Sequence, residues 1–200
     1  MPGVDVGSGS TIAVLLHQTD GGALCGFWPF ANWLATTHRL RAIAFDLCGY
    51  GLAVCTDAHY SSNQIAQVAL AVRWARSHGG RRIVLVGASM GGALALGAAT
   101  MTKADALVDL SGPESWPDAE AAVAAPRITV PALVSTSPGD GTTSYAALRA
   151  AFARIAAAPK LFVTGDGAHG WDLLADYTTA PTRWRPLATT VAQWIAGHYH

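Results

Sequence analysis

Short apolar runs that alternate with helical patterns constrain this fold more than any other feature of the 200 residues. The runs expected to be strands are residues 12–16, 42–45, 83–86, 106–110, 132–135 and 161–164. Each is almost continuously apolar, as in strands that are buried on both faces of a sheet. Strands alternating with helices form βα units, so the pattern predicts an α/β fold with a mostly parallel sheet of about six strands.

The segments between these runs have the spacing of helices that pack on a sheet. Helices are predicted over residues 27–37, 64–78, 90–101, 145–158 and 187–196. The helix predicted over residues 64–78 has the clearest ends. Ser61 and Gln64 form a capping-box pattern before it, and Gly79 and Gly80 follow its last turn. Helices between parallel strands cover both faces of the sheet, and we expect that arrangement here.

The length of the chain favours a single domain, predicted over residues 11–200. Residues 1–10 include a Gly-Ser-Gly-Ser stretch and are expected to be a flexible lead-in. The proline-rich segment 111–130 is too short for a separate cap domain. The fold is therefore expected to be a minimal one with an open or lightly covered site.

Charge and hydropathy exclude several classes of protein. The 13 basic and 13 acidic residues give a net charge of zero without a basic stripe, so no nucleic-acid partner is predicted. With 51% hydrophobic and 13% charged residues, the composition is unlike that of a disordered chain. Apolar stretches are too short for a membrane span, and the first ten residues lack a signal-peptide pattern. A cytoplasmic location is expected, with a mature secreted form left open.

The three cysteines, Cys25, Cys48 and Cys55, are odd in number and scattered, which does not indicate a disulfide framework. A pair between Cys48 and Cys55 stays open for a secreted chain. No cluster of cysteine and histidine has the spacing of a zinc site, so neither a metal nor a cofactor is predicted.

The stretch Gly87-Ala88-Ser89-Met90-Gly91 carries the clearest chemical signal. This G-x-S-x-G motif follows an apolar strand and opens a helix rich in small residues, which is the context of a nucleophile elbow. The sharp turn strains the serine backbone and exposes the hydroxyl above the sheet, while glycines avoid clashes on either side. Ser89 is therefore predicted to be a nucleophile.

With this elbow, the chain resembles the α/β-hydrolase family from about residue 11 to its C-terminus. The stretch that starts Leu15-Leu16-His17-Gln18-Thr19 is similar to the family's His-Gly loop, although Gln18 stands where glycine is usual. The resemblance implies that the backbone N–H groups of Thr19 and Met90 form an oxyanion hole. His17 is expected to hold the loop together rather than to react. The resemblance also implies a structural role for Asp46.

The order Ser, Asp, His along the chain also fits this family. Asp140 and His169 lie in glycine-containing loops that follow predicted strands, at the sheet edge where Ser89 lies. They are predicted to be the carboxylate and the base of a catalytic triad. Asp109, near the end of the preceding strand, is the alternative carboxylate. Aromatic residues at the same edge could line an acyl pocket or pack in the core; they are Trp28, Phe30, Trp116 and Trp171.

These residues predict an enzyme that cleaves small-molecule carboxylic esters through an acylated Ser89. A thioesterase, acyltransferase or other reaction on the same triad remains an alternative, because related folds carry such reactions. A binding module on a decayed hydrolase is a third hypothesis. The intact Ser89, Asp140 and His169 argue against it.

Overall fold

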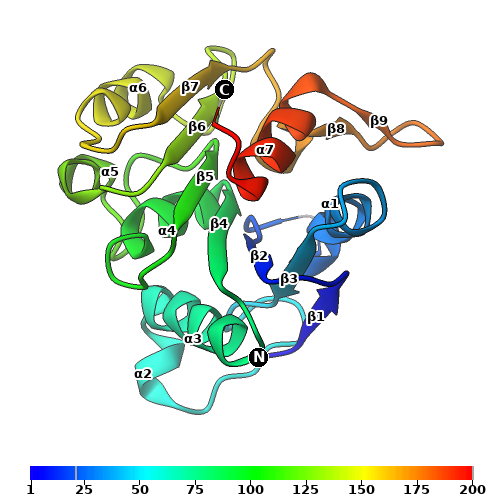
Figure 1. Cartoon of the computed structure of the whole chain (residues 1–200). Coiled ribbons are helices and arrows are strands. Elements are labelled where there is room, and N and C mark those ends of the chain that lie inside the picture. The colour runs from blue at the N-terminus through cyan, green and yellow to red at the C-terminus, as the bar shows by residue number, and fades with distance from the viewer. Residues whose placement is uncertain (21, 200) are drawn as a thin grey trace.

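The computed structural model describes residues 1–20 and 22–199, so Gly21 and His200 of the predicted domain lie outside the description. Its main sheet has seven strands in the order β1-β3-β2-β4-β5-β6-β7 (Figure 1). The strands are β1 Gly3–Val6, β2 Thr11–Leu16, β3 Arg41–Phe45, β4 Arg82–Ala88, β5 Ala106–Leu110, β6 Ala132–Thr136 and β7 Lys160–Thr164. From β3 to β7 every neighbouring pair is parallel. The predicted mostly parallel sheet is therefore confirmed.

The strand β1 corrects the expectation that residues 1–10 are a flexible lead-in. It pairs antiparallel with β3, with Gly3 opposite Phe45 and Val6 opposite Ala42. Asp5 forms an ion pair of 2.6 Å with Arg41 on that neighbour. None of the four residues of β1 is fully buried, so the strand lacks the continuous apolar run by which the other six were predicted.

Helices cover both faces of the sheet, as expected. They are α1 Leu24–Thr37, α2 Ala58–Ser61, α3 Gln64–Ser77, α4 Met90–Ala98, α5 Ala121–Ala124, α6 Tyr145–Ala153 and α7 Pro186–Ala196. Buried residues of α3, α4 and α6 share one core, and those of α1 and α7 share the other. The N-cap of α3 is Asn63, whose side chain accepts the N–H of Ala66 at 2.8 Å. Ser61 ends α2 instead, so the predicted capping box is wrong.

Parallel pairing brings the carboxyl ends of six strands, β2 to β7, to one edge of the sheet. The loops after β2, β4, β6 and β7 carry the predicted site residues, so these loops share that edge. Beyond β7 the chain forms the 3-10 turn η2 Gly170–Leu173 and the hairpin β8 Ala175–Asp176 and β9 Arg183–Trp184. In the described residues, no helix is long and apolar enough to cross a membrane.

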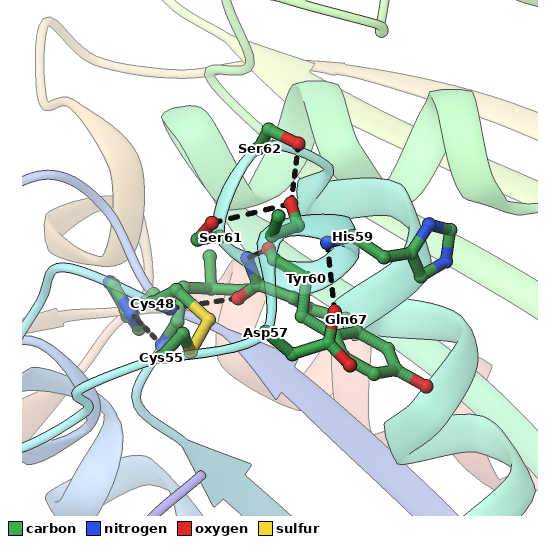
Figure 2. Close-up of a disulfide and its surroundings, with 11 residues drawn as sticks. Cys48, Cys55, Asp57, His59, Tyr60, Ser61, Ser62 and Gln67 are labelled. Atoms are coloured by element: carbon green, nitrogen blue, oxygen red, sulfur yellow. Dashed lines mark hydrogen bonds between the residues drawn. A yellow bond between two sulfur atoms is a disulfide. The ribbon is translucent and has the colours of Figure 1, made fainter.

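A disulfide between Cys48 and Cys55 closes the loop after β3 (Figure 2). Cys25 is free and exposed. The buried Gln67 of α3 supports this loop. Its side chain accepts the N–H of Cys48 at 2.8 Å and donates to the carbonyl of Tyr60 in α2 at 2.6 Å. The expectation from the odd, scattered cysteines is therefore corrected: the pair that had been left open is formed.

A fully buried carboxyl, Asp109, lies beneath the start of α4. One oxygen accepts the N–H of Gly112 at 2.7 Å, and the other has no partner among the described residues. Burial raises the pKa of Asp109 to about 7, although the bond from Gly112 lowers it. A single donor thus leaves the charged form poorly compensated.

Reducing the disulfide is expected to lower the free energy of unfolding by about 2 kcal/mol, because the sequence separation of seven closes only a short loop. Urea unfolding of Cys25→Ser protein with and without reductant measures this difference. The Cys25→Ser background removes the exposed thiol and any exchange with it. Alkylation of Cys48 and Cys55 in native, unreduced protein would contradict the pairing.

Asp109→Asn is expected to change how stability depends on pH. The folded pKa lies above the ordinary value of 3.8, so folding holds a proton that unfolding releases. The wild type therefore loses stability as pH rises from about 4 to about 7, by up to about 4 kcal/mol. The variant lacks this loss, so its stability relative to wild type rises between about pH 4 and about pH 7. Urea unfolding at a series of pH values measures both stabilities. If the stabilities of wild type and Asp109→Asn changed with pH in the same way, the assignment would be contradicted.

Candidate active site

Ser89 lies on a strained turn between β4 and α4. Its backbone has φ 50° and ψ −119°, in a region that side chains other than glycine rarely adopt. The backbone N–H of Ser89 holds the turn by donating to the carbonyl of Leu110 at 2.8 Å. The Ser89 carbonyl in turn accepts the N–H groups of Gly92 and Ala93. Strain held in this way by neighbouring strands and a helix is typical of functional sites.

The glycines of the motif allow backbones to meet that side chains would keep apart. A Cβ at Gly87 would lie 1.9 Å from the carbonyl oxygen of Gly91. A Cβ at Gly91 would lie 2.0 Å from the carbonyl oxygen of Leu16, the last residue of β2. The helix α4 therefore starts directly against the loop that follows β2.

That loop carries Thr19, one of the two predicted oxyanion donors. Within the described residues, neither the Thr19 N–H nor the Met90 N–H has a protein acceptor. Met90 is the first residue of α4, where backbone N–H groups have no partner inside the helix. The partial positive charge of the helix N-terminus favours an anion there. Both groups are therefore available to bind a developing oxyanion.

His17 and Asp46 hold the loops beside the elbow and have the structural roles expected of them. The buried His17 accepts the N–H of Leu47 at its Nε2 (3.0 Å) and donates from Nδ1 to the carbonyl of Gln18 (2.7 Å). Burial lowers the pKa of His17, in keeping with this neutral form. Asp46 accepts the N–H groups of Leu24 and Leu52 at 3.0 and 2.8 Å.

The structure brings Asp140 and His169 together across the loops after β6 and β7. Asp140 Oδ2 lies 2.8 Å from His169 Nδ1, with the carboxylate side chain fully buried and the imidazole 27% exposed. Burial raises the pKa of Asp140, but hydrogen bonds from His169 and Thr142 outweigh it, so the pKa lies below its ordinary value. The carboxylate is therefore charged at neutral pH.

Thr142 is a residue of this site that the sequence analysis missed. Its hydroxyl donates to Asp140 Oδ1 at 2.7 Å and lies 2.8 Å from His169 Nδ1 and 3.3 Å from Nε2. Its N–H also donates to Asp140 Oδ1 at 3.0 Å. A threonine two residues after an aspartate is a common turn pattern, and this spacing is the feature of the sequence that could have indicated Thr142.

Ser89 and His169 lie on adjoining loops without a direct hydrogen bond. A Cβ at Gly170, next to His169, would lie 3.6 Å from the Cβ of Ala88, next to Ser89. Within the described residues the imidazole bonds to Asp140 and Thr142. In unliganded enzymes the bond between nucleophile and base is often long and shortens when substrate binds.

Asp109, the alternative carboxylate, does not reach this imidazole. Its bonded oxygen faces Gly112, which lies against the start of α4, and no contact with His169 occurs among the described residues. The geometry therefore favours Asp140 as the partner of the histidine. In the same described residues, no group of three or more His, Cys, Asp or Glu side chains could hold a metal ion.

The aromatic residues considered for an acyl pocket divide into core and surface. Trp171 and Phe30 are buried, and the Trp171 ring meets Phe27 edge-on at 5.5 Å. Trp116 is partly buried and donates its indole N–H to Gln64 at 2.7 Å. Trp28 is 47% exposed. Trp171 and Phe30 therefore pack in the core, which is one of the two roles left open for these residues.

Solved structures with this fold include several named enzymes. A metagenome-derived lipolytic enzyme, from a study of LipS and LipT, is 16% identical with a TM-score of 0.74, covering 98% of this chain and 97% of the other. A Paleococcus ferrophilus monoacylglycerol lipase is 14% identical with a TM-score of 0.74, covering 98% of both chains. A Burkholderia xenovorans enol-lactonase is 16% identical with a TM-score of 0.73, covering 98% and 96%. At these identities the likeness shows the shared fold.

No curated protein matches the sequence. A profile of the alpha/beta hydrolase family, however, matches residues 13–198, which span β2 to the C-terminal helix and include every site residue described above. Together with the sheet order and the helices on both faces, this match shows that the chain belongs to the alpha/beta hydrolase family.

Proposed function

We propose that this hydrolase cleaves carboxylic esters, with Ser89 as nucleophile, His169 as general base and Asp140 as the carboxylate that orients the base. The observation that carries the proposal is the partly buried hydrogen bond of 2.8 Å between Asp140 and His169, beside the elbow of Ser89. A serine hydroxyl is a weak nucleophile at neutral pH and needs a neighbouring base. The imidazolium formed in the reaction needs a charged carboxylate, which Asp140 supplies.

The reaction has two halves. As Ser89 Oγ forms a bond to the ester carbonyl carbon, its proton passes to His169 Nε2, and the carbonyl oxygen becomes an oxyanion. When the carbon–oxygen bond to the alcohol breaks, His169 returns the proton to the leaving alcohol. Water then attacks the acyl group, gives a proton to His169, and releases the acid as Ser89 regains its hydrogen.

The oxyanion is proposed to be held by the backbone N–H groups of Thr19 and Met90. Each lacks a protein acceptor in the described part of the chain, so neither needs to break a bond to bind the oxyanion. Donors fixed in advance contribute most when charge develops, and removing one typically costs about 3 kcal/mol of transition-state stabilisation.

Ester cleavage is favoured over the other reactions of this fold by the names of similar structures. They are described as lipolytic enzymes, a monoacylglycerol lipase and an enol-lactonase. Each name refers to an enzyme that breaks an acyl–oxygen bond. Small-molecule esters, including lactones, are therefore the substrate class proposed for this chain.

The disulfide supports a location in an oxidising compartment for this enzyme. Bonds such as Cys48–Cys55 persist in secreted or periplasmic proteins and are rare in the cytosol. The secreted alternative is therefore proposed in place of the cytoplasmic location expected from the sequence.

Wild-type protein is expected to gain one fluorophosphonate adduct, as Ser89 Oγ bonds to phosphorus and fluoride leaves, whereas Ser89→Ala gains none. Intact mass spectrometry measures the adduct without a choice of substrate. Ester and thioester panels, with and without added alcohol, then separate hydrolysis from acyl transfer. A folded wild type that takes no label and turns over no ester would refute the proposal.

Asp140→Asn is expected to lower kcat about 10³- to 10⁴-fold, because it loses the charge that stabilises the imidazolium. Asp109→Asn makes the same chemical change at a buried carboxyl outside the site, and its kcat is expected to stay within about twofold of wild type. Steady-state kinetics on the best ester of the panel tests both. If Asp109→Asn lowered kcat more than Asp140→Asn does, Asp109 would be the carboxylate of the triad.

A further inference from the structure

The side chain of Gln18 joins two loops of the proposed site. It is 5% exposed. Its Oε1 accepts the N–H of Trp171 at 3.4 Å, two residues after His169. Its Nε2 donates to Asp20 Oδ1 at 2.5 Å, next to the proposed oxyanion donor Thr19.

These two partners fix the orientation of the amide. Trp171 presents a donor and Asp20 presents an acceptor, so only one of the two amide orientations satisfies both. The reverse orientation would place the amide NH₂ against an N–H and the amide oxygen against a carboxylate. A residue with oxygen alone or with no polar group at position 18 therefore loses at least one of the two bonds.

The backbone around His169 is shaped to receive this side chain. Gly170 has φ +57°, and a Cβ there would lie 2.1 Å from Gln18 Oε1. The same Cβ would lie 3.6 Å from the Cβ of Ala88, beside Ser89. Gln18 therefore lies where the oxyanion loop, the nucleophile elbow and the histidine loop meet.

We propose that Gln18 is a positioning residue that sets the distance between the oxyanion donor on one loop and His169 on the other. The inference rests on the proposed ester hydrolysis. Gln18 touches neither substrate nor the reacting atoms, and it acts through the backbone of Trp171 and through Asp20. Because it holds both loops, its loss affects the chemical step more than the binding of substrate.

Gln18→Met keeps the length of the side chain and removes both hydrogen bonds. We expect kcat to fall about 10- to 100-fold while KM stays within about threefold, since small misplacements of reacting groups have effects of this size. The rate of fluorophosphonate labelling should fall in parallel. An unchanged kcat in folded Gln18→Met protein would overturn the proposal.

The pH dependence of kcat in Gln18→Glu distinguishes the contact with Asp20 from the contact with Trp171. The glutamate keeps an acceptor for Trp171 but repels Asp20 when charged, and it donates a proton to Asp20 only when protonated. We expect the ratio of kcat in Gln18→Glu to kcat in wild type to rise as pH is lowered from about 8 to about 5.5. The other titratable groups nearby, His17, His169 and Asp172, are common to both proteins, so the ratio reports on position 18.

Gln67→Met is the matched control. Gln67 is also a buried glutamine with two hydrogen bonds between loops, but it holds the disulfide loop and α2 (Figure 2). We expect it to lose stability as Gln18→Met does and to keep kcat within about twofold. An equal loss of kcat in both variants would assign Gln18 a merely structural role.

Hydrogen exchange of the Trp171 amide makes the inference testable apart from turnover. We expect faster exchange at Trp171 in Gln18→Met than in wild type and in Gln67→Met. Unchanged protection overturns the inference even if wild type hydrolyses esters. Failure of the proposed function would give a different result. Wild type would then neither take the fluorophosphonate label nor turn over any ester, while exchange of its Trp171 amide would still be slowed by Gln18.

Discussion

The contact between Gly91 and the carbonyl of Leu16 is the constraint on which the site depends. It lets the first turn of α4 pack directly against the last residue of β2, with no side chain between the two backbones. The turn before α4 then has no room to relax, and Ser89 keeps its positive φ. The same contact brings the loop of Thr19 beside the elbow. One close approach therefore sets both the exposure of the hydroxyl and the place of the proposed oxyanion hole.

Two buried carboxyls at this sheet edge illustrate how hydrogen bonding decides charge. Asp140 receives bonds from His169, from Thr142 and from the N–H of Thr143, and its pKa lies below the ordinary value. Among the described residues Asp109 receives one bond, from Gly112, and burial raises its pKa to about 7. The number of donors, rather than depth alone, makes one of them suited to stabilise an imidazolium.

Much of the fold was predictable because buried parallel strands and G-x-S-x-G have strong local signals. Ser89, Asp140 and His169 came from motif and chain order, and the structure brings the last two into contact. The strand β1 was missed because its four residues depend on pairing with β3, a contact distant in sequence. The disulfide was not expected because residue counts do not reveal which cysteines meet. Thr142 and Gln18 depend on loop geometry, which a short pattern does not specify.

The place of β7 in the sheet has a mechanical consequence for the enzyme. As an edge strand it pairs, in the part of the chain that the structure describes, on one side only, with β6, and none of its residues is fully buried. His169 follows this strand, whereas Ser89 follows the central, buried β4. Edge elements open at a lower cost in free energy than the centre of a sheet. Heat should therefore separate the histidine from the serine before the core melts, so that inactivation precedes unfolding and reverses on cooling.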